Sequence, residues 1–420
     1  AMKVHQRSMK KEMKKNRFFL HLATMALLFS CTPDETPEMK LYPIIYTKNT
    51  TGINAMGATL NAEFINMGYD AVVRYGFVYG TEDPTIDSSA ITVINAEAGK
   101  GEFFQTINTG LAGNMIYKVK AYAKTRDFVV YGNEIEFLSQ GSAYNPWDLM
   151  AEPTMDGWHN AHGISGDKYG YILFQSGDFY SYDPVSETVT KLQNIPMDGN
   201  TGTLYASFEL DGSLFVMSND AEQLLRFNTK TGQWSKPGDL PFNIGDNNFF
   251  GFTINNEGAF LSGAYFYTYN EVSHGWTKRA DIPSTNVHSA IVIENRVYAI
   301  ADYKEIWMYD PLTDVWQKKS VFPGTWHGKV LGFSANNRIY WGLSYHGGYT
   351  GAPKPATDIW EYNPETNSWK GIERFPTYHS QTELFTFSFD SLSFFGYRNS
   401  DFQNNSDQYL IFGFNPEKIK

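Results

Sequence analysis

The sequence predicts an all-β protein in which a small β-sandwich precedes a closed ring of four-stranded sheets. Composition favours a β fold, because aromatic residues make up 16% of the 420 residues, 36 residues are glycine, and charged residues account for only 19%, below the roughly 25% typical of soluble domains. Short runs of alternating apolar and polar residues lie between turn-forming residues. In the C-terminal two-thirds, one aromatic motif recurs at intervals of 40 to 53 residues, which is the spacing of four-stranded repeat units.

Residues 1–31 have the order of a secretory signal: a basic stretch at 10–17, a mainly apolar run of twelve residues at 18–29, and then Ser30 and Cys31. Twelve residues are too few to span a bilayer core, which needs about 20. The sequence 28–31, Leu-Phe-Ser-Cys, resembles a bacterial lipobox. The resemblance implies that Cys31, the only cysteine, is lipidated and anchors the chain in the outer membrane. An ordinary signal and a buried thiol are the alternatives.

Residues 32–40 form an acidic, Pro-containing tether that is too polar to fold by itself. Acidic residues directly behind the lipidated cysteine resemble the surface-export signal of Bacteroidetes lipoproteins. This resemblance implies a location on the cell surface, with a periplasm-facing orientation as the alternative.

Residues 41–140 are expected to form the β-sandwich, because alternating strand-like runs such as 72–79 and 117–123 are separated by turn signals. Leu111 lies six residues before Tyr117, which begins one of these runs. This pattern resembles the fibronectin type III domain, in which such a Leu and Tyr fix a corner between two sheets. The segment has no paired carboxylates, histidine cluster or phosphate-binding loop, so we expect it to be a spacer.

Residues 144–420 carry a repeat in which an aromatic residue and Asp or Asn are followed by Trp seven residues after the aromatic and by Pro seven residues later. Tyr309, Trp316 and Pro323 show the complete spacing. Each copy predicts a hairpin, a third strand that ends at the aromatic, a tight turn at Asp/Asn-Pro, and a fourth strand that carries Trp. The leading aromatics are Tyr182, Phe227, Tyr269, Tyr309, Tyr362 and Phe414.

The sixth copy begins at Phe414 and has no fourth strand of its own before Lys420. At the other end of the repeat region, Trp147 stands without a repeat in front of it. We therefore expect the Trp147 segment to complete the last sheet, so that the ring closes by strand exchange and leaves no open edge.

The motif aromatic-Asp/Asn-Pro-x-Thr-x-x-Trp, best seen at residues 362–369, resembles the kelch repeat. The resemblance covers residues 144–420 and implies a six-bladed β-propeller. Only Gly347-Gly348 matches the double glycine of that family, so the propeller is a divergent one.

The two faces of such a ring are expected to differ. First-to-second turns are predicted to be short and polar, at Asp211-Gly212, Glu257-Gly258, Asn295-Arg296 and Asn336-Asn337. The opposite face should carry the long loops at 344–357 and 397–407, and variable loops on a fixed scaffold are where function usually lies.

Several histidines that each follow an aromatic or apolar residue are expected just before inner strands, near the mouth of the central channel on the long-loop face. An aromatic ring beside an imidazole can stack on a sugar and bind its hydroxyls. Alternatively, the aromatics wedge between blades and the imidazoles bond to backbone. The candidate ligand-binding residues are Trp158, His159, His162, His288, Trp326, His327, Tyr345, His346, Tyr378 and His379.

These patterns favour a surface-anchored binding lipoprotein that recognises a carbohydrate or glycoprotein. Kelch-like propellers include sialic acid mutarotases, so a sugar mutarotase or epimerase is the enzymatic alternative, with His159, His327, His379 and Arg398 as candidate acid, base and carboxylate-binding groups. A protein-docking scaffold is the third possibility.

Other function classes are not expected. Imidazoles on separate blades ring the channel and do not converge tightly on one point, and His159 and His162 are the only close pair, so a metal site is the less favoured alternative. There is no phosphate-binding loop or nucleophile elbow, and we expect neither metal nor cofactor. A net charge of −11 disfavours nucleic acid as a partner. We expect a monomer that contacts the membrane through its lipid anchor only.

Overall fold

The structure, a computed structural model, is all-β and propeller-like. Among the described residues, the helical element is the short 3₁₀ helix η1 (Pro416–Lys418), and no helix is long and apolar enough to cross a bilayer. The described residues are 40–87, 89–156, 161–196, 204–218, 223–240, 249–284, 286–345, 356–372, 374–376, 384–389, 391–398 and 408–419.

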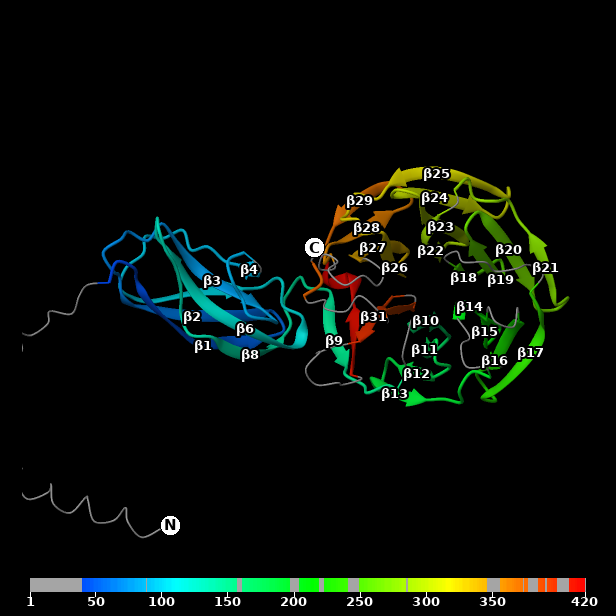
Figure 1. Cartoon of the computed structure of the whole chain (residues 1–420), viewed down its shortest axis with the longest axis horizontal. Coiled ribbons are helices and arrows are strands. Elements are labelled where there is room, and N and C mark those ends of the chain that lie inside the picture. The colour runs from blue at the N-terminus through cyan, green and yellow to red at the C-terminus, as the bar shows by residue number, and fades with distance from the viewer. Residues whose placement is uncertain are drawn as a thin grey trace, which may run out of the picture.

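Two sheets make up the N-terminal domain (Figure 1). On β2 the alternation predicted from the sequence is present, because Leu60, Ala62 and Phe64 are buried while the residues between them are partly exposed. One sheet contains β1 (Ile44–Asn54), β2 (Gly57–Asn66) and β5 (Gly101–Ile107). The other contains β3 (Arg74–Gly80), β4 (Ala90–Ile91), β6 (Gly113–Lys124), β7 (Val129–Tyr131) and β8 (Ile135–Gln140).

Tyr117 on β6 fixes the chain directly before its own strand. Its hydroxyl accepts a hydrogen bond from the Ala112 amide (2.9 Å) and donates one to the Gly110 carbonyl (3.3 Å), while Leu111 is fully buried. The Leu111–Tyr117 spacing therefore corresponds to a real corner in the domain.

Five four-stranded antiparallel sheets follow in sequence order, with the first strand of each on the inner side of a ring and the fourth on the outer side (Figure 1). The first two are β10 (Ala161–Ser165), β11 (Gly170–Phe174), β12 (Phe179–Asp183), β13 (Thr188–Lys191), and β14 (Leu204–Leu210), β15 (Ser213–Ser218), β16 (Gln223–Asn228), β17 (Gln233–Asp239). The third and fourth are β18 (Phe249–Ile254), β19 (Glu257–Ser262), β20 (Tyr265–Asn270), β21 (Gly275–Lys278), and β22 (Val287–Ile293), β23 (Arg296–Ala301), β24 (Glu305–Asp310), β25 (Val315–Val321). The fifth is β26 (Lys329–Ala335), β27 (Arg338–Tyr345), β28 (Ile359–Asn363) and β29 (Ser368–Gly371).

The ends of the repeat region meet in a further run of four strands, β30 (Phe385–Ser388), β31 (Ser393–Arg398), β32 (Tyr409–Phe414) and β9 (Trp147–Ala151). Strand β9 pairs antiparallel with β32, so that Trp147 lies opposite Phe414. The Trp147 side chain is fully buried, with its ring 4.8 Å from that of Phe414 and 5.0 Å from that of Phe375. The predicted pairing of the Trp147 segment with the C-terminal strand is confirmed.

Tryptophans of the outer strands β25 and β29 join their sheets to the preceding ones. The indole Nε1 of Trp316 donates to the Ala280 carbonyl (2.9 Å), and that of Trp369 donates to the Ser320 hydroxyl (2.8 Å). Because each Trp lies one sheet later than its acceptor, the repeated tryptophan is a structural link between sheets and belongs to the core.

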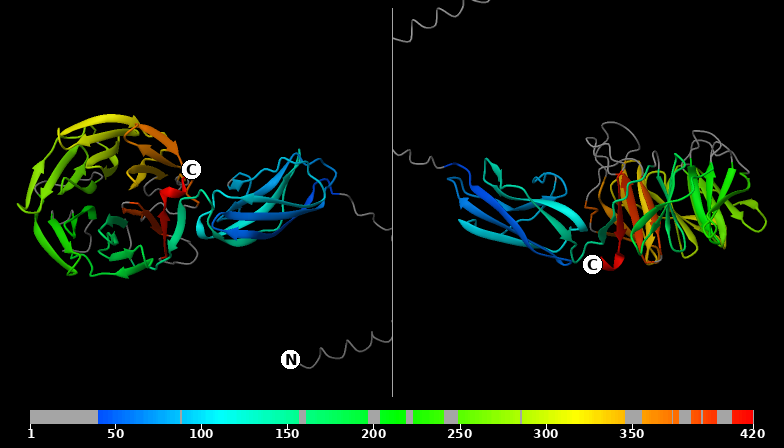
Figure 2. Two further views of the ribbon diagram at one scale, coloured as in Figure 1. Left: turned by 180° about the vertical axis from the view of Figure 1, so that it is seen from behind. Right: turned by 90° about the horizontal axis from the view of Figure 1, so that it is seen from below.

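The sandwich contacts the ring at β9 (Figure 2). The Asp148 carboxylate accepts a hydrogen bond from the Gly113 amide (3.2 Å) and pairs with Lys418, and the Asn114 side chain donates to the Leu149 carbonyl (3.0 Å). Strand β9 is therefore held by β32 along one edge and by the start of β6 along the other.

Candidate functional site

The inner-strand turns define one face of the ring, which we call the short-turn face. It carries the first-to-second turns Asp211-Gly212, Asn255-Asn256, Glu294-Asn295 and Asn336-Asn337. Two of the predicted turns were displaced, because strands β19 and β23 already begin at Glu257 and Arg296. The turns lie just before them, where Asn255, Asn256 and Asn295 adopt positive φ angles of 51°, 58° and 56° that asparagine tolerates well.

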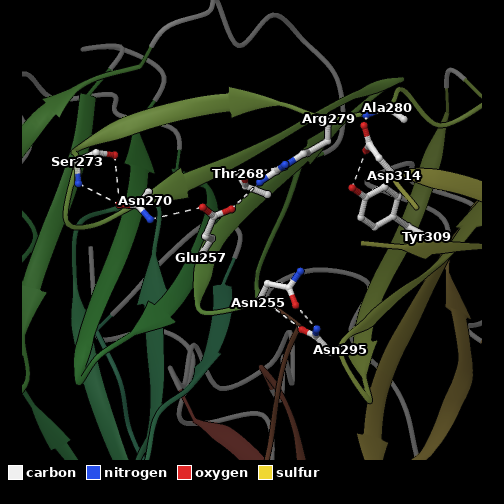
Figure 3. Close-up of polar contacts among 10 residues, drawn as sticks. All are labelled: Asn255, Glu257, Thr268, Asn270, Ser273, Arg279, Ala280, Asn295, Tyr309 and Asp314. Atoms are coloured by element: carbon white, nitrogen blue, oxygen red, sulfur yellow. Dashed lines mark hydrogen bonds and ion pairs between the residues drawn. The ribbon is translucent and has the colours of Figure 1, made fainter. Parts of the chain in front are cut away.

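Hydrogen bonds tie neighbouring sheets together along this face. The Asn255 amide donates to the Asn295 side chain (2.7 Å), and the side chains of the two residues also bond (Figure 3). The Asn337 side chain then donates to the Glu294 carboxylate (3.4 Å). The third, fourth and fifth sheets are thus joined turn to turn.

Serine hydroxyls continue the same linkage. The Ser334 amide donates to the Ser388 hydroxyl (3.2 Å), and the Ser388 amide donates to the Ser165 hydroxyl (2.8 Å). These bonds run from β26 through β30 to β10, so the short-turn face has a rim of fixed polar groups.

Other carboxylates of the third and fourth sheets have partners within the protein. Glu257 pairs with Arg279 (2.8 Å), whose Nε also donates to the Thr268 hydroxyl (Figure 3). Asp314 accepts from the Tyr309 hydroxyl (2.7 Å) and the Ala280 amide (2.9 Å). These groups stabilise turns and are already satisfied within the protein.

A cavity of about 890 Å³ lies inside the rim. Its lining is mainly polar and includes the carboxylates of Asp167, Glu209 and Glu294, the hydroxyls of Ser165, Ser334 and Ser388, and the amides of Asn336 and Asn337. Burial raises the pKa of Glu209, and the nearby Asp167 and Asp211 carboxylates raise it further, against a hydrogen bond from the Gly212 amide. Sequence reasoning missed this site because it assigned function to the opposite face.

Three side chains meet on the opposite face of the ring, where β27 and β31 end. We call it the long-loop face after the loops predicted at 344–357 and 397–407, most of whose residues lie outside the described part of the chain. The rings of His288 and Trp326 lie edge to face with centroids 4.8 Å apart, and the Tyr303 ring lies 6.1 Å from that of Trp326. We call these three residues the aromatic cluster. His288 begins the fourth sheet on β22, Tyr303 lies between β23 and β24, and Trp326 precedes β26 of the fifth sheet.

Local geometry holds each member of the aromatic cluster. Tyr303 lies at the tip of a tight turn, because Asp302 and Lys304 on either side have φ angles of 48° and 69°, and its side chain is 71% exposed. His288 Nε2 donates to the Asp302 carbonyl (3.0 Å). Burial lowers the pKa of His288, so its ring is neutral at pH 7.

Other candidates lie near the same end of the fifth sheet. The His327 amide donates to the Ser344 hydroxyl (2.7 Å), which in turn donates to the Lys329 carbonyl (2.8 Å). Tyr345, the last residue of β27, lies opposite Lys329. His327 and Tyr345 therefore lie at the same end of the fifth sheet as Trp326.

The remaining candidates are dispersed or lie outside the described residues. His162 is on β10 opposite Leu173, and Arg398 ends β31 opposite Tyr409, so both belong to other sheets than the aromatic cluster. No group of three or more His, Cys, Asp or Glu in the described part of the chain is arranged to hold a metal ion. The predicted site residues that lie outside the described part of the chain are Cys31, Trp158, His159, His346, Tyr378 and His379.

Two signals in the sequence could have found the missed residues. Glu209 is the only Asp or Glu on the described inner strands β10, β14, β18, β22, β26 and β30, whose other residues are apolar, small, hydroxyl-bearing or basic. Tyr303 sits in a short Asp-Tyr-Lys connection between two apolar strands, where a large aromatic residue cannot be part of the sheet core.

Comparisons with known proteins complete the description. No protein-family model matches the chain, and no curated protein matches it. A solved structure of YjhT is 13% identical with a TM-score of 0.48, and the match covers 63% of this chain and 99% of that chain. The extracellular domain of the proposed one-component system BT4673 from B. thetaiotaomicron is 15% identical with a TM-score of 0.38, and the match covers 55% of this chain and 30% of that chain. At these identities the comparisons assign no function.

Proposed function

We propose that the chain is a surface-anchored lipoprotein that binds a carbohydrate or glycoprotein on the long-loop face of a six-bladed, kelch-type propeller. The observation that carries the proposal is the aromatic cluster of His288, Tyr303 and Trp326, in which a strongly exposed Tyr stands beside a half-buried Trp. Sugars present flat patches of C–H groups that stack on such rings. The cluster thus offers an apolar platform with polar edges.

His288 acts within the aromatic cluster as a positioning residue. Its Nδ1 is buried, and its Nε2–H is used by the Asp302 carbonyl, so the imidazole has no polar atom to offer a ligand. Its edge-to-face contact instead holds the Trp326 ring in one orientation. A neutral imidazole suits this role because a charged ring would be costly to bury beside Lys329.

Lys304 reinforces the same arrangement. Its ammonium group donates to the Gly324 carbonyl (2.6 Å) and lies 5.7 Å from the centre of the Tyr303 ring. The bond joins the turn that carries Tyr303 to the segment that leads to Trp326. The two rings are therefore fixed before a ligand arrives, which lowers the entropic cost of binding.

The N-terminal third would then hold the binding face away from the membrane. In this proposal Cys31 is lipidated, residues 32–40 form a tether, and the fibronectin III-like sandwich is a spacer. The contacts of Asp148 and Asn114 between the sandwich and β9 support a fixed orientation of the ring on that spacer.

A glycan array tests the binding proposal. We would screen the full chain with Cys31→Ser, so that it is not lipidated, and repeat the screen with Trp326→Ala and Tyr303→Ala. We expect a defined glycan to bind and each variant to weaken it at least about tenfold, equivalent to ~1.4 kcal/mol, because the stacking surface is lost. Tyr69→Ala is the matched control, because Tyr69 is 77% exposed but lies in the sandwich.

Two results would contradict the proposal. One is an array without any reproducible glycan. The other is a glycan that binds Trp326→Ala and Tyr303→Ala as tightly as the parent chain while both variants keep the parent's melting temperature.

A further inference from the structure

The cavity on the short-turn face is a feature that the proposed function does not use. It lies at the ends of the inner strands that carry Ser165, Glu209 and Ser334, whereas the aromatic cluster lies at the opposite ends of the strands. We infer that this cavity is a second ligand site, and that it takes a small protonated amino sugar.

The polar lining favours a ligand with several hydrogen-bonding groups. The Ser165, Ser334 and Ser388 side chains and the amides of Asn336 and Asn337 offer both donors and acceptors. Phe389 and Val292 add a limited apolar surface. Hydroxyls on a compact ring match this mixture, because each hydroxyl both donates and accepts while the C–H groups pack against the apolar side chains.

The charges in the lining favour a cation. Asp167, Glu209 and Glu294 contribute carboxylates, and no Lys, Arg or His is among the described residues that line the cavity. Within the described part of the chain, none of the three carboxylates forms an ion pair with a Lys or Arg. Some carboxylates outside the cavity do form such pairs, as Glu257 does with Arg279 (2.8 Å) and Asp178 with Lys191 (3.1 Å).

The carboxylates of the lining that lack an ion pair indicate that the ligand supplies the positive charge. Lys168 follows Asp167 in the chain and Arg338 bonds to the Asn337 carbonyl, but neither side chain belongs to the lining. Among the residues that the structure describes, the site therefore has acceptors for a positive charge and no cationic lining group. An ammonium group, with three donors, is the simplest complement.

Several lining groups are held by hydrogen bonds, and the cavity is of suitable size. One Glu209 oxygen is held by the Gly212 amide (2.7 Å), and one Glu294 oxygen by the Asn337 side chain (3.4 Å). The Ser388 hydroxyl is held between Ser334 and Ser393. A volume of about 890 Å³ falls within the roughly 300–1,000 Å³ of small-molecule sites.

Calorimetric titration with glucosamine tests the inference, with glucose and N-acetylglucosamine as uncharged comparisons. We expect glucosamine to bind the full chain at pH 7 and both comparisons to bind at least tenfold more weakly, because neither carries an ammonium group. Glu209→Gln and Asp167→Asn should each weaken glucosamine binding about tenfold without lowering the melting temperature. Glu365→Gln is the matched control, because Glu365 is an exposed glutamate that is not part of the lining.

Three results would overturn the inference. They are no detectable heat with glucosamine at 10 mM, equal affinity for glucosamine and N-acetylglucosamine, and unchanged glucosamine affinity in both Glu209→Gln and Asp167→Asn. The outcome is independent of the proposed function, since Tyr303→Ala should abolish the glycan-array signal and leave glucosamine binding unchanged.

Discussion

Glu209 places a carboxylate in a half-buried position on an inner strand, and this has a consequence for stability. Burial is the main cause that raises its pKa, so the folded protein holds the Glu209 proton more tightly than the unfolded chain does. Stability must then fall as pH rises from the ordinary glutamate pKa, about 4.3, through the raised value, because the folded state binds more protons over that range. Above the raised pKa, the stability stays at this lower level.

We therefore predict that Glu209→Gln stabilises the protein at neutral pH. A neutral amide removes the cost of burying a charge, and its oxygen can still accept the Gly212 hydrogen bond. The gain in unfolding free energy over the parent chain, measured by urea denaturation, should be near zero at pH 4 and grow to a plateau towards pH 8. Exposed Glu365→Gln serves as the control, with little change at any pH. A Glu209→Gln variant that gains stability on acidification instead would refute this assignment.

At the residue scale, the sequence predicted structural positions better than functional ones. Tyr117, Trp147 and Trp316 were found because each stands at a fixed spacing in a sequence motif. Tyr303 and Glu209 were not found, because their importance depends on which ends of the strands meet in space. That information comes from the closed ring and is absent from local patterns.

The inner strands share a further element-scale feature, because glycines occupy equivalent positions on alternate sheets. A Cβ at Gly163 on β10 would lie 2.1 Å from the Thr386 carbonyl oxygen on β30, and one at Gly251 on β18 would lie 2.3 Å from the Ser207 carbonyl oxygen on β14. At Gly332 on β26 it would lie 2.6 Å from the Ser289 hydroxyl on β22. These glycines let neighbouring inner strands approach closely in pairs.

We predict that Gly251→Ala destabilises the protein by about 2 kcal/mol, because a backbone carbonyl cannot yield to a methyl group without moving a strand. Chemical denaturation would measure the change. Gly238→Ala is the matched control, because Gly238 lies in β17 and a Cβ there would meet nothing within 4 Å. Equal stability of the two variants would show that the inner strands separate without cost.

The sequence predicted the strands and the Asp/Asn turns, but it shifted two of the first-to-second turns by one or two positions. In those hairpins a polar residue follows the turn as well as forming it, since Glu257 and Arg296 begin strands. Polarity alone does not distinguish the two cases. The left-handed conformation at Asn255 and Asn295 does, and it becomes visible only in the structure.

At the scale of the whole molecule, closure of the ring depends on the buried side chain of Trp147, which packs against Phe414 at the far end of the sequence. We predict that Trp147→Ala costs about 3–5 kcal/mol, because it removes the contacts with Phe414 and Phe375. Hydrogen exchange should accelerate in both β9 and β32. Trp276→Ala is the control, because Trp276 packs on Tyr269 in the third sheet and should leave hydrogen exchange in β9 and β32 unchanged. Faster exchange confined to β9 would contradict the role of Trp147 in closure.

Ring closure also sets an order of events during synthesis. Strand β9 ends at Ala151 and its partner β32 begins at Tyr409, so roughly 260 residues separate them, and at about 5–20 residues per second the ribosome needs on the order of 13–50 s to make the second after the first. Throughout that interval β9 lacks its partner strand β32, and its unpaired edge can pair with other strands. The sandwich is complete by then, and its Gly113 and Asn114 groups bond to Asp148 and Leu149. The folded N-terminal domain can thus hold one edge of β9 until β32 has been synthesised.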